Sequence, residues 1–505
     1  MTKVLLQGGT LVDATGIRSG LDVLIDNSEI IEIAPNISPP RGARLIDCDG
    51  CMISPGLVDL HTHLREPGNE EAETIESGTR AAVAGGYTAV VCMPNTEPPI
   101  DNATAVRDIL AMSKDALCAV IPAGTITVGR EGERLSPMVE MNACGVRLFT
   151  DDGRGVQSAS VMRRALEYAS ALGATIAQHC EMEDLAANTV MNEGYLSSVM
   201  GVQGAPNCAE ELMLERDLEL AALCGARIHF MHLSTHGSVE LVRRAKLAGM
   251  QVTAEVTPHH ISLTDDMLSG YNPIYKVNPP LRTRKDITAL VRALSDGTID
   301  AIATDHAPHV RESKELPLDQ APPGMIGLET ALAVVITVLK DNSGEVGTGR
   351  KDASGNGRSG NNRSGNNRSG RTYSTKSNSV KSEYGNSGSA GGGRPNNSYS
   401  EHLTIDPSVL QYSMNMVDII AAMSWKPAAI AGLDVASGGR HGGPIVPGAP
   451  ANLTVFDPSA DWRVDAPRLL SKSGNSPFDG LSLTGKVRHT IYEGEPVYLD
   501  GRATK

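Results

Sequence analysis

Apolar and polar residues alternate in short runs along the first fifty residues, a pattern that predicts β-strands separated by turns. The runs are Val4 to Gln7, Leu21 to Ile25, Ile30 to Ile33 and Arg44 to Cys48. The last sixty residues repeat the pattern at Ala451 to Asp457, Trp462 to Val464, Val487 to Tyr492 and Pro496 to Leu499. Strands this short and polar cannot close a core alone, so we expect both chain ends to build one small β domain, a β-sandwich.

Between the two ends, apolar β-branched runs alternate with helical patterns. Eight runs predict buried strands: Leu57 to Leu60, Tyr87 to Cys92, Leu117 to Ala123, Val146 to Thr150, Thr175 to Gln178, Ile228 to Met231, Gln251 to Val256 and Ile299 to Ala303. Helical periodicity marks Glu73 to Ala84, Val161 to Leu172, Ala209 to Leu223 and Ser238 to Ala248. This alternation predicts an α/β protein with a (β/α)8 TIM-like barrel, and a doubly wound open sheet is the structural alternative.

The composition changes abruptly between about residues 342 and 400, where Gly, Ser, Asn and Arg dominate and the repeat RSGNNRSGNNRSG occurs. So few large apolar residues cannot bury enough surface to fold, which predicts a disordered insertion whose deletion leaves activity intact. The expected division is 1–54 for the N-terminal part of the β domain, 55–341 for the barrel, 342–400 for the insertion, 401–440 for final barrel-associated helices and 441–505 for the C-terminal part of the β domain.

Charge and cysteine content restrict the class of protein. A formal net charge of -14 argues against nucleic acid or an anionic membrane as the main partner. The eight cysteines are scattered and predict reduced thiols. The N-terminus has no signal-peptide pattern, and no uninterrupted apolar run approaches the ~20 residues that span a bilayer. We therefore expect a cytoplasmic protein.

Residues able to bind a metal stand at the ends of five predicted strands. His61 and His63 lie two residues apart in an extended segment, which puts both imidazoles on one side. The other strand ends carry Asp151-Asp152, His179, His232 and Asp305. In a barrel all these ends open onto one face. Nitrogen and oxygen ligands without thiolate suit zinc or manganese, and six donors exceed one tetrahedral ion, which favours two metals sharing a carboxylate.

Such a site performs amide hydrolysis or its reverse, because a metal lowers the pKa of water toward 7 and a carboxylate moves the proton. Asp305 is the candidate proton shuttle, and a simple ligand role is the alternative. Arg65, beside the histidine pair, is the expected clamp for a substrate carboxylate. Asn95, Asn278 and His309 lie on loops of the same predicted face, where turn-capping or exposed side chains are the ordinary alternative.

The motifs HTHLREPG, MPNTEPP, FTDDG, QHCE, MHLS, AEVTPHH, NPPLR and ATDHAPH follow one another in this order. In this set and order the chain resembles the bacterial dihydroorotases of the longer, barrel-plus-β-sandwich type, within the amidohydrolase superfamily, over nearly all of its length outside the insertion. The resemblance implies a zinc-dependent cyclic amidohydrolase that reversibly cyclises N-carbamoyl-L-aspartate to L-dihydroorotate with loss of water, in pyrimidine biosynthesis.

Carried over residue by residue, the resemblance implies two zinc ions. His61, His63 and Asp305 would hold one, His179 and His232 the other, and Asp152 would bridge them. Asp305 would be the proton shuttle. Substrate contacts would come from His63, Arg65, Asn95, Asn278, His309 and the backbone of Pro323 and Gly324 in the segment Ala321 to Gly324.

Two alternatives to dihydroorotase activity remain. One is a related cyclic amidohydrolase that acts on hydantoins, dihydropyrimidines or allantoin, and the other is a non-enzymatic scaffold. The dihydropyrimidinase and hydantoinase group typically carries a carboxylated lysine at the end of strand 4, where this chain has Phe149-Thr150-Asp151-Asp152. Allantoinase-like proteins usually have Asn-Glu-Pro where this chain has Arg65-Glu66-Pro67. A non-enzymatic scaffold that binds an aspartate transcarbamoylase would lack metal ligands, and each ligand position here is filled. Self-association, or association with a transcarbamoylase, is an expectation for an active enzyme too.

Overall fold

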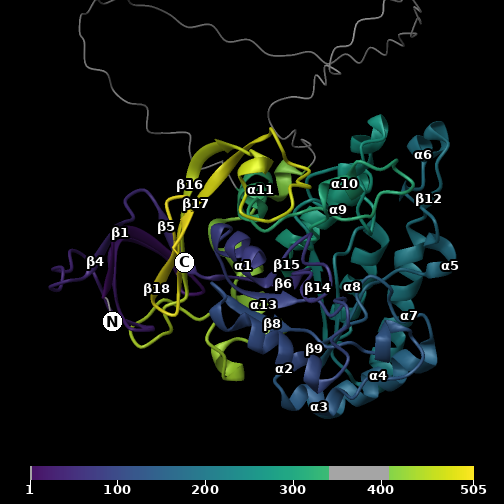
Figure 1. The fold of residues 1–505 in the computed structure, drawn as a ribbon, viewed down its shortest axis with the longest axis horizontal. Coiled ribbons are helices and arrows are strands. Elements are labelled where there is room, and N and C mark those ends of the chain that lie inside the picture. Colours follow the sequence, from purple (N-terminus) through teal and green to yellow (C-terminus); the bar gives the residue numbers. More distant parts are fainter. Residues whose placement is uncertain (1–2, 341–408, 505) are drawn as a thin grey trace, which may run out of the picture. The chain divides into compact units, whose positions relative to one another are not determined.

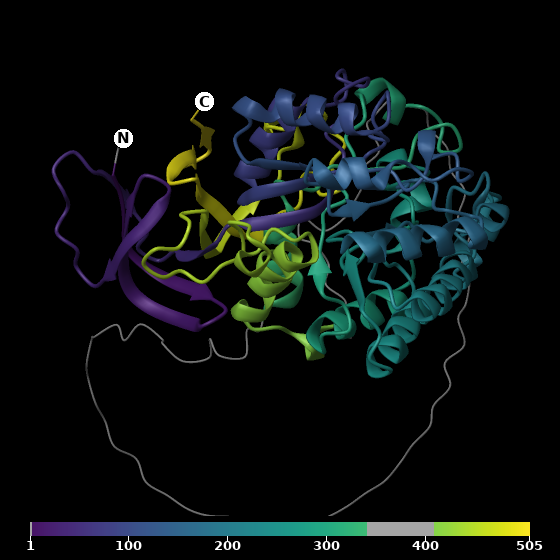
Figure 2. The same cartoon turned by 90° about the horizontal axis from the view of Figure 1, so that it is seen from below.

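The computed structural model describes residues 3–340 and 409–504 (Figures 1 and 2). The chain divides into one unit of residues 1–341 and 401–505 and a second unit of residues 342–400. The predicted insertion falls outside the described residues, so its predicted disorder stays a prediction. The first unit contains both the expected β domain and the expected α/β region.

Both ends of the chain contribute to one nine-stranded sheet. Its strands are β1 (Val4–Asp13), β2 (Gly16–Asp26), β3 (Glu29–Ala34), β4 (Arg44–Asp47), β5 (Met52–Pro55), β16 (Leu453–Arg463), β17 (Ser482–Tyr492), β18 (Glu495–Leu499) and β19 (Arg502–Ala503). The ends join where β5 pairs antiparallel with β16, with Ile53 opposite Val455. In Figure 1 the purple and yellow strands lie side by side accordingly. We call this element the terminal sheet.

One predicted boundary in the terminal sheet is wrong. Trp462 to Val464 is no separate strand, because β16 runs from Leu453 to Arg463 and keeps pairing with β17 past an irregularity between Asp457 and Asp461. Pro458 lies in that irregular stretch. β5 was not predicted, because its residues, Met-Ile-Ser-Pro, do not alternate between apolar and polar positions.

The eight predicted strands of the central region are all present. They are β6 (Leu57–Thr62), β7 (Tyr87–Cys92), β8 (Ala119–Pro122), β9 (Leu148–Phe149), β10 (Thr175–Gln178), β13 (Ile228–Phe230), β14 (Val252–Val256) and β15 (Ala301–Ile302). They form two parallel sheets, β6-β7-β8 and β9-β10-β13-β14-β15. Parallel bridges join Gly124, after β8, to Phe149 and join His306, after β15, to Thr62. Hydrogen bonding therefore passes through all eight strands and returns to β6.

Helices connect these strands, as Figure 2 shows. They are α1 (Ile75–Ala84), α2 (Ala103–Met112), α3 (Met138–Ala143), α4 (Ala159–Leu172), α5 (Glu183–Ala186), α6 (Tyr195–Met200), α7 (Cys208–Cys224), α8 (His236–Leu247), α9 (Arg284–Ser295), α10 (Arg311–Lys314), α11 (Ala331–Leu339), α12 (Met416–Met423) and α13 (Trp425–Ile430). A short pair, β11 (Met191–Asn192) and β12 (Gly204–Ala205), lies between α5 and α7. α1 starts where expected, because the Thr74 hydroxyl accepts a hydrogen bond from the Ser77 amide and caps the helix.

Several groups of buried apolar residues stabilise the described unit, the largest of which includes Val90, Phe149, Ile176 and Leu332; two smaller groups are of interest for the site. The terminal sheet buries a cluster that includes Val4, Leu6, Ile53 and Val455. The parallel strands enclose a smaller cluster that includes Leu60, Met231, Ala177 and Ala301.

The helical stretch Met416–Ser437 is strongly apolar. Among the described residues, Met416–Ser437 is long and apolar enough to cross a membrane by composition, with 22 residues and a mean hydropathy of 1.3, and 56% of its most apolar window is buried. It contains α12 and α13, both of which pack against β6 and β15. The apolar character of this stretch is therefore accounted for by packing against the strands.

Candidate metal centre and active site

His61 and His63 lie at the carboxyl end of β6 and face the same side, as their spacing predicts. Their ring centroids are 5.2 Å apart, and the two residues are 0% and 6% exposed. Asp152, from the loop after β9, approaches both: its Oδ1 is 3.3 Å from His61 Nε2 and its Oδ2 is 3.6 Å from His63 Nε2. These three residues form a first group of candidate ligands.

A second group of candidate ligands shares the same carboxylate. His179, after β10, and His232, after β13, place His179 Nδ1 and His232 Nε2 only 2.9 Å apart. Asp152 Oδ1 is 3.7 Å from the first nitrogen and 3.9 Å from the second. The two groups of candidate ligands therefore share Asp152, which lies between four histidines.

Asp305, after β15, completes the cluster from the opposite direction. Its Oδ1 is 3.1 Å from His63 Nε2 and 3.4 Å from His61 Nε2. Asp305 has a φ of 47°, and His232 and Arg65 also have positive φ values, 33° and 63°. Non-glycine residues adopt this conformation at a cost, and such residues concentrate at functional sites. Three predicted site residues share this feature.

The arrangement fits a metal, because the outer nitrogen of each of three histidines has an acceptor that can hold its proton, which would leave the inner nitrogen free to bind a cation. His61 Nδ1 contacts Glu255 Oε1 at 3.3 Å, His63 Nδ1 contacts Asn95 Oδ1 at 3.0 Å, and His179 Nε2 contacts Glu181 Oε2 at 3.1 Å. A ring nitrogen that donates its proton outward leaves the other nitrogen with a lone pair, as in metal-bound histidines. Those lone pairs point toward Asp152. His61 Nε2 is buried and has no hydrogen-bond partner among the described residues, so a cation would satisfy it.

Electrostatics keep the two aspartates ionised. Burial alone would raise the pKa of Asp305, but the charge of His61 and the hydrogen bond with His63 hold that pKa well below its ordinary value. The pKa of Asp152 is likewise lowered despite burial, chiefly by His61. Both side chains are thus carboxylates at neutral pH, the form that binds a cation.

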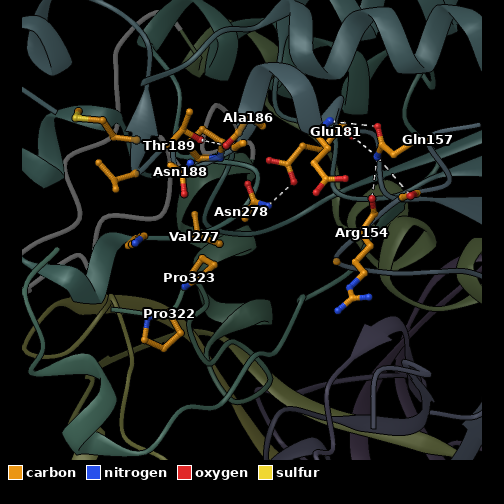
Figure 3. Close-up of a pocket in the computed structure, with 18 of the residues that line it drawn as sticks. Arg154, Gln157, Glu181, Ala186, Asn188, Thr189, Val277, Asn278, Pro322 and Pro323 are labelled. Carbon is orange, nitrogen blue, oxygen red and sulfur yellow. Dashed lines mark hydrogen bonds between the residues drawn. The ribbon is translucent and has the colours of Figure 1, made fainter. Parts of the chain in front are cut away.

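Asn95 and Asn278 contact different residues of the cluster. Asn95, after β7, accepts from His63 through Oδ1 and donates through Nδ2 to Asp152 Oδ2 at 3.2 Å. Asn278 donates through Nδ2 to Glu181 Oε2 at 2.7 Å, and Glu181 in turn contacts His179. Figure 3 shows Asn278 pointing toward Glu181 across the pocket. Both asparagines therefore belong to the cluster rather than to isolated turns.

Arg65 and His309 lie on adjoining loops. Arg65 Nε donates to the Pro308 carbonyl at 3.1 Å, which ties it to the loop of His309. His309 Nε2 donates to the Pro323 carbonyl at 2.9 Å. Burial lowers the pKa of His309 to about 3, with a further contribution from the charges of Arg65 and Lys314. His309 is therefore neutral at physiological pH.

A cavity of about 1160 Å³ opens beside the cluster. Its lining includes Asn278, Pro323, Glu181, Gly153 and Arg130 (Figure 3). The Arg130 guanidinium donates to the Asp152 carbonyl at 2.6 Å, so this wall is continuous with the candidate metal ligands. The cavity therefore lies next to the cluster, although none of the six candidate ligands is among its lining residues.

The structure separates the two residues of the Asp151-Asp152 pair. Asp151 Oδ1 accepts hydrogen bonds from the amides of Ile126 and Thr127, at 2.8 and 3.0 Å, and its other oxygen accepts from the Thr127 hydroxyl. Asp151 thus anchors the loop after β8, while Asp152 faces the histidines. Cys92 and Cys180 are buried, as expected of small core residues.

Three residues of the cluster were not predicted. Glu181 and Glu255 orient His179 and His61, and His229 supports Glu255 through a 3.1 Å contact with Oε2. Glu181 had a usable signal, since it follows His179 by two residues and so shares its side of an extended segment. Glu255 and His229 had a weaker one, namely a charged residue inside an apolar strand.

Comparison with known proteins adds an independent line of support. The model of a family described as Dihydro-orotase-like matches residues 50–238. The curated dihydroorotase of Streptomyces coelicolor is 40% identical over 507 residues, covering 100% of both chains. The dihydroorotase of Pelotomaculum thermopropionicum is 39% identical and covers 99% of both.

Solved structures with similar folds come from hydantoinases. L-hydantoinase (dihydropyrimidinase) from Arthrobacter aurescens has a TM-score of 0.74 at 22% identity, covering 100% of this chain and 98% of that one. Dihydropyrimidinase from Brevibacillus agri has a TM-score of 0.74 at 19% identity, with 100% and 96% covered. At such low identity these two establish similarity of fold alone.

Proposed function

The chain belongs to the dihydroorotase family, and from this premise we propose that it catalyses the reversible cyclisation of N-carbamoyl-L-aspartate to L-dihydroorotate and water in pyrimidine biosynthesis. The observation that carries the proposal is Asp152 shared between two histidine pairs, with Asp305 beside them. Such a centre is suited to making and breaking an amide bond.

We infer that the eight parallel strands form a (β/α)8 barrel and that the terminal sheet is the small β-sandwich domain. Support comes from the bridges that return hydrogen bonding from His306 to Thr62 and from the similarity to hydantoinases. The proposed boundaries are those given above from the sequence. In such a barrel the strand carboxyl ends carry the active site, which agrees with the positions of the cluster residues.

The donor set suits two zinc ions. We assign His61, His63 and Asp305 to one ion and His179 and His232 to the other, with Asp152 bridging. When bound, the ions supply Lewis acidity, which lowers the pKa of water and polarises a carbonyl oxygen. Glu255, Asn95 and Glu181 hold three of the imidazoles in the required orientation.

Asp305 carries the proton in this scheme. In ring opening its carboxylate takes a proton from water and returns it to the departing amide nitrogen. In ring closure the same carboxylate removes the proton from the attacking carbamoyl nitrogen and returns it to the departing carboxylate oxygen, which leaves as hydroxide and takes up one proton from solution to become water. Its low pKa makes it a carboxylate before the reaction starts. Its position 3.1 Å from His63 Nε2 puts it within reach of both the ligands and the substrate face.

Substrate recognition falls to residues beside the candidate metal ligands, of which Asn278 and Pro323 also line the cavity. Arg65 pairs with the substrate carboxylate, and Asn95, Asn278 and His63 contact its polar atoms. Neutral His309 and the backbone of Pro323 and Gly324 close the pocket. Because Arg65 selects for an anion, dihydroorotate is favoured over hydantoin, dihydrouracil and allantoin, which have no carboxylate.

Cellular context is part of the same proposal. We propose a cytoplasmic enzyme that acts on a small molecule, and self-association or association with an aspartate transcarbamoylase stays a prediction. A scaffold without activity would not need the complete ligand set. A single assay separates these alternatives.

The experiment compares substrates on the purified protein. Ring opening of L-dihydroorotate, hydantoin, dihydrouracil and allantoin is followed by ultraviolet absorbance at equal concentrations. We expect turnover of dihydroorotate alone. Preference for a neutral ring would overturn the substrate assignment but keep the hydrolase, and no turnover by metal-loaded protein would favour the scaffold.

A further inference from the structure

A segment of the C-terminal part of the chain lies among the loops of the candidate active site. Residues 471–476 come between β16 and β17 of the terminal sheet. The Lys472 amide donates to Glu73 Oε1 at 3.0 Å, and the Ser473 hydroxyl donates to the Ala72 carbonyl at 2.7 Å. These contacts fix the segment against the loop before α1.

Asn475 links this segment to two loops of the candidate site. It is 3% exposed, and its side chain bonds to two different loops. Its Oδ1 accepts from the His309 amide at 3.2 Å, and its Nδ2 donates to the Ala307 carbonyl at 3.0 Å and to the Gly324 carbonyl at 3.2 Å. One amide group thus satisfies the backbone of both substrate-contacting loops.

The two loops touch each other where Asn475 holds them. Gly324 has a φ of +133°, and a Cβ there would lie 2.7 Å from His309 Nε2 and 2.9 Å from Ala307 Cβ. The Ala307 amide also donates to the Met325 carbonyl at 2.9 Å. The distance between His309 and the backbone at residue 324 is therefore set by close contact, and small changes in either loop move both.

Lys314 is a second support for the same loop. Its Nζ donates to the carbonyls of Pro322 and Gly324, each at 3.0 Å, and Lys314 is buried. The Gly324 carbonyl therefore accepts from both Asn475 and Lys314. A carbonyl with two donors has both of its lone pairs occupied, which restricts rotation of that peptide.

We propose that Asn475 is a positioning residue that sets the distance between His309 and the Pro323–Gly324 backbone, so that the C-terminal β region contributes to substrate binding. The inference rests on the proposed function, because it assigns these loops to substrate recognition. Asn475 itself acts through the loops and not on the reacting atoms.

The test uses three variants of the full-length, metal-loaded protein. Asn475→Ala removes all three side-chain bonds. Asn475→Asp keeps an oxygen that accepts from the His309 amide but replaces the donor with a carboxylate oxygen facing two carbonyls. Ser473→Ala is the matched control, since Ser473 lies in the same segment and is 5% exposed but donates to Ala72 instead.

We expect KM for dihydroorotate to rise about 10- to 30-fold in both Asn475 variants, from loss of two to three hydrogen bonds, with kcat within about 3-fold of wild type. In Asn475→Asp the KM should fall as the pH is lowered, because a protonated carboxyl group can again donate a hydrogen bond. Ser473→Ala should keep the wild-type KM. Metal content should be the same in all four proteins.

Amide hydrogen exchange over residues 305–326 gives a readout that does not depend on turnover. Faster exchange there in the Asn475 variants than in Ser473→Ala supports the proposal even if wild type fails to open dihydroorotate, in which case the proposed function alone falls. An unchanged KM together with unchanged exchange would overturn it. The proposal would also be overturned if Ser473→Ala changed kcat, KM and thermal stability as much as the Asn475 variants do, because the segment would then have only a structural role.

Discussion

The carboxyl ends of the parallel strands and the interior of the terminal sheet are both buried, yet they bury different kinds of residue. At the strand ends His61, Asp152 and Asp305 are 0%, 3% and 5% exposed. In the terminal sheet the corresponding interior consists of aliphatic side chains such as Ile53 and Val455, both 0% exposed.

Buried ionisable groups cost free energy unless they are paired. The terminal sheet buries few ionisable groups and pairs them, as Asp13 is paired with Arg18, whereas the strand ends bring several carboxylates and imidazoles together at the candidate site. Substitutions in the two regions should therefore separate: one set should change activity and metal binding, the other the free energy of unfolding.

The largest effect is expected for Asp305→Ala. Without its proton shuttle the enzyme should lose about 10³-fold or more in kcat for dihydroorotate, the upper range for acid–base catalysis. Thermal stability should fall modestly, because the lowered pKa of Asp305 means that its interactions with His61 and His63 outweigh its desolvation cost. Activity within ten-fold of wild type would assign the proton to another group.

Adjacent aspartates should behave differently. Asp152→Asn should lower bound metal and reduce turnover at least ~100-fold, since loss of an outer partner alone costs ~10- to 100-fold. Asp151→Ala should keep its metal and lose about 2 kcal/mol of unfolding free energy, with three hydrogen bonds removed. Elemental analysis and chemical denaturation of both proteins test this. Equal metal loss in the two variants would refute the separation of their roles.

Ile53→Ala tests the terminal sheet. Removing this buried side chain at the junction of β5 and β16 should cost about 2–5 kcal/mol of unfolding free energy. The folded enzyme should keep its kcat and KM, because the cluster around Ile53 contains none of the candidate site residues. A change in kcat at a temperature where the variant is fully folded would show that the two regions are coupled.

The smallest effect concerns His441, which contacts Thr88 at 3.2 Å away from the cluster. Burial, with a contribution from Arg440, lowers its pKa from 6.5 to about 4. Between these values the unfolded chain binds the proton and the folded one does not, so stability falls as pH falls, by ~1.4 kcal/mol per pH unit. His441→Gln should lack this contribution, measured as a smaller loss of unfolding free energy from pH 6.5 to 5. The assignment would be contradicted if the unfolding free energy of wild type and of His441→Gln depended on pH in the same way.

The parallel strands could be predicted because a strand buried on both faces is an almost continuous apolar run. Tyr87 to Cys92, for example, coincides with β7. The sequence could not predict the end of β16, where Asp457 to Asp461 is an irregularity rather than a turn. Pairing across several hundred residues, as between β5 and β16, leaves no local pattern. It follows only from the need of both ends for a partner.

The candidate site was predictable to the extent that residues stand at strand ends. His179 and His232 were placed by that rule, and the structure brings them to 2.9 Å. Glu255 and Asn475 were missed for different reasons. Glu255 points into the cluster from inside a strand, and Asn475 arrives from a segment more than 150 residues away from His309 and Gly324 in sequence. Long-range contacts of this kind have no signature in spacing.

The central claim is that Asp152 joins two metal sites that act on dihydroorotate. Its most direct test is removal of metal with a chelator followed by stepwise addition of zinc, with metal content by elemental analysis and dihydroorotate turnover measured at each step. The account predicts saturation at two zinc ions per chain, with full activity restored, and a stoichiometry that falls in Asp152→Asn. Full activity at zero zinc, or a stoichiometry unaffected by Asp152→Asn, would contradict it.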